Sequence, residues 1–94
     1  IWVEFKNVRG NDGWMYGKAD WIAFELPEVC GFVMVLREEL ASLAEEIVDP
    51  VFVDKKDADR KYYQRKDRLD IISRLWLDDL KRCPSYNVLP YADA

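Results

Sequence analysis

Ninety-four residues suffice for one domain with a single modest core, and a composition that is half apolar and 34% charged excludes a disordered chain. The formal net charge of −4 excludes nucleic-acid binding by overall charge alone, and the absence of histidine excludes Ser-His-Asp and Cys-His catalysis. No apolar run approaches the roughly 20 residues that span a bilayer, so we expect a soluble cytoplasmic protein without membrane contact.

The first eight residues alternate in polarity, which predicts a strand over positions 1–8. Apolar side chains share one face, whereas a tryptophan and two charged residues share the other: Ile1, Val3 and Phe5 against Trp2, Glu4 and Lys6. Because this pattern is already in mid-strand at residue 1, we expect the domain to begin upstream of the chain.

A glycine-containing loop follows, and an aromatic-rich cluster, Trp14–Tyr16, comes directly after it. We expect this cluster to close one end of the core, with base stacking or contact with a partner as the alternative. Strands are predicted over 20–26 and 32–36, and a turn between them favours an antiparallel hairpin. The unbroken apolar run over 32–36 predicts burial on both faces of that strand.

Apolar residues at helical spacing predict a helix over 37–48, which the Asp49-Pro50 pair ends. A short edge strand is expected over 51–53, and an exposed charged loop or ribbon over 54–68. The stretch from Asp70 to Trp76 fits a strand and also helical spacing. We favour a strand there, followed by a short helix over 77–82, and we expect an irregular tail over 84–94.

The expected fold is therefore one α/β (α+β-like) domain over 1–94. Its mixed sheet is built around the three strands 1–8, 20–26 and 32–36, and the helix over 37–48 packs against that sheet. The lone cysteines, Cys30 and Cys83, are expected to be free thiols, with one disulfide in an oxidising compartment as the alternative.

A run of basic residues lies between positions 55 and 68. Its members are Lys55, Lys56, Arg60, Lys61, Arg65, Lys66 and Arg68. With Tyr62 and Tyr63 the run has the aromatic and basic composition of a nucleic-acid surface. Aspartates interrupt it, so a solvated mixed-charge stretch or an amphipathic edge strand explains it as well, and Arg65, Arg68 and Asp70 also suit a structural ion-pair set.

The Glu4-Phe5-Lys6 triplet is the strongest chemical signal. Strand alternation places Glu4 and Lys6 on one side, roughly 7 Å apart. Hydrolysis of a phosphodiester with Mg²⁺ needs oxygen ligands and a cation, which the Glu4 carboxylate, the Phe5 carbonyl and the Lys6 ammonium would supply. Taken alone, the same triplet also fits a cross-face ion pair on any half-exposed strand.

The order of segments resembles the core of the PD-(D/E)XK nuclease superfamily, especially its small phage-encoded members. The matching segments are Val3–Asn7, a glycine-containing loop, Gly17–Phe24, the strand over 32–36 and the helix after it. A later run, Tyr63–Ile72, is similar to the family's arginine-rich element.

The resemblance implies a restriction-endonuclease-like fold and Mg²⁺- or Mn²⁺-dependent cleavage of DNA, with RNA left open. It makes Glu4 a metal carboxylate, Lys6 the catalytic lysine, Asn7 its polar neighbour and Lys18 a phosphate contact. The family's first aspartate precedes the Glu-x-Lys strand, and no aspartate precedes Glu4 here. We therefore expect this chain to hold only part of a catalytic site.

Nucleic-acid contacts are assigned to Lys18, Arg60, Lys61, Arg65 and Arg68. A homodimer is compatible with this activity, because two copies of one site often cut the two strands of a duplex. Asp20 fits a strand-start acid that holds a backbone amide, with a functional role as the alternative. The competing hypothesis for the whole chain is a small non-catalytic protein-interaction module.

Overall fold

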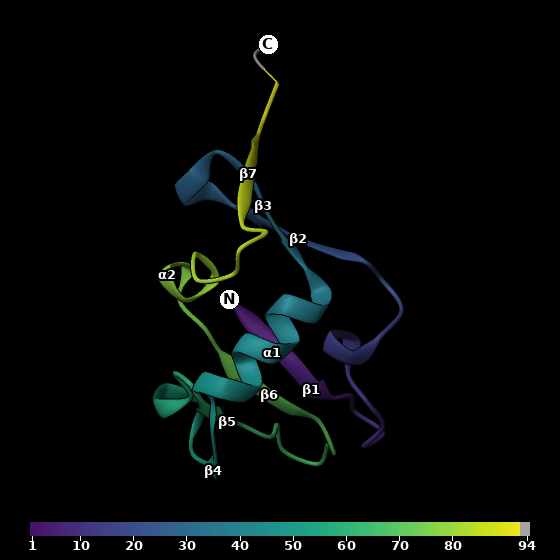
Figure 1. Cartoon of the computed structure of the whole chain (residues 1–94). Helices are drawn as coiled ribbons and strands as arrows, with labels where there is room; N and C mark the ends of the chain where they lie inside the picture. The colour runs from purple at the N-terminus through teal and green to yellow at the C-terminus, as the bar shows by residue number, and fades with distance from the viewer. Residues whose placement is uncertain (93–94) are drawn as a thin grey trace.

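A computed structural model describes residues 1–92, which form an α+β structure and confirm the predicted fold class. Figure 1 shows its strands and helices. In chain order they are β1 (Trp2–Lys6), β2 (Trp21–Leu26), β3 (Gly31–Leu36), α1 (Arg37–Ile47), β4 (Asp49–Phe52), β5 (Lys61–Tyr62), β6 (Ile71–Arg74), α2 (Leu77–Leu80) and β7 (Asn87–Pro90). Single 3₁₀ turns lie at Trp14–Tyr16, Pro27–Val29 and Lys55–Asp57.

The strands form three small sheets, so the expectation of one mixed sheet is wrong. β1 pairs antiparallel with β6, the hairpin β2–β3 pairs antiparallel with β7, and β4 pairs parallel with β5. The periodicity of a strand predicts its two faces and carries no information on its partner. Here the partner of β1 comes from the far end of the chain, where Val3 faces Ser73.

The β2–β3 hairpin is confirmed, and its register runs unbroken from Trp21 opposite Leu36 to Leu26 opposite Gly31. Only one face of β3 is fully buried, with Val33 and Val35 inaccessible to solvent. The prediction of burial on both faces is therefore wrong, because no layer covers the outer face of this small sheet within residues 1–92.

The tail over 84–94 is not irregular throughout, because β7 adds to the edge of β3. The backbones of β3 and β7 approach closely at Gly31, since a Cβ atom built on this residue would lie 2.3 Å from the carbonyl oxygen of Leu89. Any side chain at this position would force the two strands apart. Residues 93–94, the end of the predicted tail, lie outside the described part of the chain.

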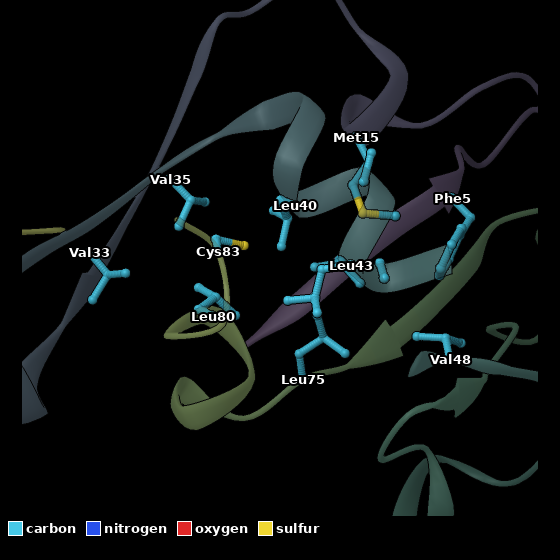
Figure 2. Close-up of a cluster of buried hydrophobic side chains, with 13 residues drawn as sticks. Phe5, Met15, Val33, Val35, Leu40, Leu43, Val48, Leu75, Leu80 and Cys83 are labelled. Atoms are coloured by element: carbon cyan, nitrogen blue, oxygen red, sulfur yellow. The ribbon is translucent and has the colours of Figure 1, made fainter. Parts of the chain in front are cut away.

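The hydrophobic core lies between α1, β1, β6 and the inner face of β3 (Figure 2). The largest fully buried side chains are Met15, Leu40, Leu75 and Leu80. Met15 comes from the Trp14–Tyr16 turn, which confirms that this cluster closes one end of the core. The helix predicted over 37–48 is also confirmed, with its apolar stripe on the core side.

Beyond α1, the predicted order of a strand and then a short helix is confirmed by β6 and α2. Two buried carboxylates, one directly before β6 and one within α2, each bind an arginine. Asp79 accepts hydrogen bonds from Arg60 and from the backbone N–H of Trp76, and Asp70 binds Arg65. These pairs connect the charged stretch over 54–68 to the segments that contain β6 and α2.

Two regions can be distinguished in Figure 1. The sheet β2–β3–β7, which we call the arm, projects away from α1, β1, β6 and the β4–β5 pair. These elements, together with α2 and the turns and loops that join them, are called the body. The molecule is accordingly elongated, with principal extents of 43 × 28 × 24 Å. No helix within residues 1–92 is long and apolar enough to cross a membrane.

Candidate functional site

Glu4 lies at a cavity of about 340 Å³ beside the β1–β6 sheet. The cavity, here called the Glu4 cavity, combines one carboxylate, two cations and three aromatic rings. Its lining residues are Trp2, Val3, Glu4, Trp14, Lys55, Tyr63, Arg65 and Ile72. They come from β1, β6, the turn after the first loop, and both ends of the charged stretch over 54–68. The fold thus brings distant segments around one predicted site residue.

The loop after β1 holds the Glu4 side chain in place. One carboxylate oxygen of Glu4 accepts a hydrogen bond from the backbone N–H of Trp14 at 3.3 Å. The neighbouring N–H of Gly13 donates to the carbonyl oxygen of Phe5 at 2.8 Å. A Cβ atom on Gly13 would lie 2.3 Å from the carbonyl oxygen of Glu4, so only glycine allows the loop to approach β1 this closely.

Lys6 lies at a different cavity from Glu4. The pairing of β1 with β6 is irregular between Glu4 and Lys6, a β-bulge that locally bends the strand. The Lys6 ammonium binds the Asp12 carboxylate at 3.0 Å, and both side chains are exposed. The cavity at Lys6 has about 380 Å³ and shares no lining residue with the Glu4 cavity. Its lining residues are Phe5, Lys6, Asp12, Tyr16, Tyr62 and Ile71.

Of the predicted nucleic-acid contacts, Arg65 is the one that lines the Glu4 cavity. Its Nε donates to the buried Asp70 carboxylate at 2.5 Å, which confirms Arg65 and Asp70 as a structural ion pair. Arg60 donates a hydrogen bond to Asp79, and this bond raises the pKa of the Arg60 guanidinium above its usual value. Lys61 and Arg68 line none of the cavities described here.

The remaining predicted site residues lie elsewhere. Lys18 is exposed on the loop before β2. Asn7 caps its own turn, where its side-chain oxygen accepts hydrogen bonds from the backbone N–H groups of Arg9 and Asn11. Asp20 lies at a small separate cavity of about 110 Å³ beside the start of α1. None of these three residues lines the Glu4 cavity.

Lys55 is the cavity cation that sequence reasoning missed. The sequence showed Lys55 only as one member of a basic run, and the residues around it do not distinguish it from Lys56. The cavity's aromatic wall was also missed, because it joins Trp2 to Tyr63 across the β1–β6 sheet. Their ring centroids are 6.0 Å apart at 45°, and the Arg74 guanidinium lies 5.3 Å from the centre of the Trp2 ring.

The donor set near Glu4 is small. Within residues 1–92, no group of three or more histidine, cysteine, aspartate or glutamate side chains is arranged to hold a metal ion. Cys30 and Cys83 are free thiols. No protein family, curated protein or solved structure matches the chain. Function is therefore inferred from the residues and their geometry.

Proposed function

We propose that this chain is a nuclease-like domain that binds nucleic acid at the Glu4 cavity and contributes to Mg²⁺- or Mn²⁺-dependent hydrolysis of its phosphodiester bonds. The observation that supports this proposal is the composition of the cavity. A carboxylate, two cations and three aromatic rings converge there from distant parts of the chain. A carboxylate can bind a divalent cation, and Lys55 and Arg65 can neutralise a phosphate.

The donors around Glu4 fit Mg²⁺ as a partial ligand set. One Glu4 oxygen is held by the Trp14 amide, and the other makes no hydrogen bond within residues 1–92. The Phe5 carbonyl, the other expected ligand, accepts from the Gly13 N–H, and Phe5 lines the cavity at Lys6 rather than the Glu4 cavity. Mg²⁺ commonly takes one or two carboxylates and fills its other positions with water and substrate phosphate, so the Glu4 carboxylate suffices only with those ligands. When bound, the ion would activate water and polarise the phosphate.

The proposal gives Lys6 the role of a third cation, supplied from the cavity at Lys6. Its ammonium is bound to Asp12 in an exposed pair. Such a pair contributes about 1 kcal/mol or less, so a nearby phosphate competes readily with Asp12 for the lysine. Lys55 already lines the Glu4 cavity. The free thiols Cys30 and Cys83 fit the reducing cytoplasm, which we propose as the location.

The test is nicking of supercoiled plasmid with Mg²⁺ or Mn²⁺. It uses the 94-residue chain and any longer reading frame that contains it. We expect nicking to fall at least tenfold in Glu4→Gln and in Lys6→Ala, because each removes an interaction with the metal or the phosphate. The matched controls are Glu28→Gln and Lys81→Ala, both on exposed side chains away from the Glu4 cavity. Sedimentation of the active form with and without duplex DNA tests the proposed homodimer.

Nicking that persists in Glu4→Gln would refute the catalytic role of this cavity. Retention in Lys6→Ala with loss in Lys55→Ala would move the cationic role from Lys6 to Lys55. An aspartate shortly before Glu4 in the longer reading frame would supply the family's first metal ligand, and its conversion to asparagine should also abolish nicking.

A second candidate is a non-catalytic protein-interaction module. The observation that favours it is the exposure of large apolar residues on the small sheet of the arm, where a partner could cover them. These residues are Trp21, Val88, Leu89 and Tyr91. The absence of any metal-dependent nicking by the longer protein, together with loss of an isolated partner in Trp21→Ser, would favour this candidate.

A further inference from the structure

We propose that the Glu4 cavity is a subsite for one unpaired nucleotide, so that the chain prefers single-stranded or locally opened nucleic acid over continuous duplex. This inference rests on the proposed function, because it names the class of nucleic acid that the cavity takes. Its three supports are the fixed guanidinium of Arg65, the aromatic wall and the size of the cavity.

The geometry of Arg65 suits its guanidinium to bind an anion. Its Nε donates to Asp70 at 2.5 Å, and the same carboxylate accepts from the Arg65 backbone N–H at 3.2 Å. Asp70 is fully buried, whereas the Arg65 side chain is 42% exposed. Within residues 1–92 the two Nη nitrogens of Arg65 make no hydrogen bond. A guanidinium anchored through Nε presents its remaining N–H groups to a phosphate without losing side-chain entropy.

Lys55 adds a second cation from the opposite end of the charged stretch. Its side chain makes no ion pair within residues 1–92, in contrast to the Arg60, Arg65 and Arg74 side chains, which all bind carboxylates. Lys55 and Arg65 balance the charges of Glu4 and Asp70, so they act on a phosphate as local N–H donors rather than through a net positive charge. Charge-assisted hydrogen bonds from these two side chains can bind a phosphate locally although the whole chain has a net charge of −4.

The aromatic wall supplies a surface for a base. Trp2 and Tyr63 are tilted at 45° with centroids 6.0 Å apart, and Trp14 also lines the cavity. Stacking on such rings tolerates any base, because every base has a π face. A paired base in a duplex is already stacked on its neighbours and exposes only its edge. An unpaired nucleotide can therefore use this wall, and a paired one cannot.

The size of the cavity fits one nucleotide. Its volume of about 340 Å³ lies at the lower end of the range for small-molecule sites. Glu4 lies in the same cavity, so a nucleotide bound there carries its phosphate close to the proposed metal ligand. The subsite and the proposed chemistry are thereby adjacent.

The test is equilibrium binding by fluorescence polarisation, with EDTA present so that no cleavage occurs. The probes are a labelled single-stranded DNA of about 12 nucleotides, a usual site size for small single-strand binders, and the same strand in a duplex. We expect the single strand to bind at least about tenfold more tightly, the scale of one stacked base. Lys55→Ala should weaken single-strand binding and reduce the slope of log K against log salt by about 0.7, one phosphate contact.

The adjacent and exposed Lys56 gives the matched control, because it does not line the cavity, and Lys56→Ala should bind like the parent. Tyr63→Leu should bind about tenfold more weakly with an unchanged salt slope, whereas Tyr63→Phe, which keeps the ring, should retain affinity. Lys55 is exposed, so its variant folds even if a Tyr63 variant does not. Equal binding of duplex and single strand, or equal losses in the two lysine variants, would overturn the subsite.

The two proposals fail separately. Glu4-dependent nicking without a single-strand preference would overturn the subsite and leave the nuclease proposal standing. A single-strand preference that depends on Lys55 and Tyr63, without cleavage by the longer protein, would refute the hydrolysis and support the subsite.

Discussion

The body and the arm are held together by different interactions. The body contains most of the fully buried side chains, including Met15, Leu40 and Leu75, and both buried carboxylates with their arginines. The arm buries one face of β3, packs Ile22, Phe24 and Leu26 of β2 partly against the core, and leaves other apolar residues of β2 and β7 exposed. The Glu4 cavity belongs to the body. A site built on a packed body keeps its geometry, whereas the exposed apolar residues of the arm are available to a partner.

The largest expected difference in the free energy of unfolding comes from truncating one leucine side chain in each region. Leu40 is fully buried in α1, so Leu40→Ala should lower the free energy of unfolding by about 2–5 kcal/mol. Leu89 on β7 is 57% exposed, so Leu89→Ala should change it by no more than about 0.5 kcal/mol. Urea denaturation followed by tryptophan fluorescence measures both. Similar losses in the two variants would show that the arm contributes to the core as much as the body does.

The regions also contain matched glycines that allow close backbone approach. A Cβ atom on Gly13 would lie 2.3 Å from the Glu4 carbonyl oxygen, and one on Gly31 would lie 2.3 Å from that of Leu89. We expect Gly13→Ala and Gly31→Ala to cost about 1–3 kcal/mol each, because backbone has to move.

Their effects on binding should differ. Gly13→Ala displaces the loop that places Trp14 in the wall of the Glu4 cavity, so it should weaken single-strand binding, whereas Gly31→Ala should leave binding unchanged. Chemical denaturation and fluorescence polarisation on the same samples separate the two effects. Weaker binding in Gly31→Ala would mean that the arm takes part in recognition.

The sequence predicted local structure well and tertiary partners poorly. The 3.6-residue period of Leu40, Leu43 and Ile47 predicted α1 to within one residue at its end, and the hairpin β2–β3 was predicted with nearly its observed bounds. Both patterns are local, so a single sequence contains them. The pairing of β1 with β6 joins residues about 70 positions apart, so no local sequence pattern predicts it.

The candidate site shows the same difference between local features, which the sequence predicts, and long-range contacts, which it does not. Glu4 was predicted from the Glu-x-Lys triplet, and the structure places it in a cavity. Strand alternation also placed Lys6 beside it, but the bulge after Glu4 interrupts the regular pairing, and the two side chains line separate cavities. Lys55 and Tyr63 reach the cavity only through long-range folding. β7 was missed because Pro84 and Pro90 suggested an irregular tail, although proline is tolerated on an edge strand.

The smallest expected contrast concerns one tyrosine–glutamate hydrogen bond in each region. Tyr16 donates to Glu45 of α1 at 2.8 Å, and Tyr91 donates to Glu25 of β2 at 2.6 Å. Burial and then the bond to Glu45 raise the pKa of the Tyr16 phenol well above its usual value, whereas the bond to Glu25 is the main cause that raises the pKa of Tyr91.

A phenol whose pKa is higher in the folded state stabilises the fold fully below its unfolded pKa of about 10, and the stabilisation is lost as the pH rises towards the folded value. Tyr16→Phe should therefore lower stability by about 1 kcal/mol at neutral pH. The difference between parent and variant should shrink above about pH 10. Tyr91→Phe should show a weaker trend in the same direction, because that phenol is solvated and gains little from burial. Urea denaturation from about pH 8 to about pH 11 measures both, and the comparison with each variant cancels the titration of the other tyrosines and lysines. An equal or larger effect at Tyr91 would show that the arm's hydrogen bond to β2 is protected from water, and that the two regions differ less than their burial indicates.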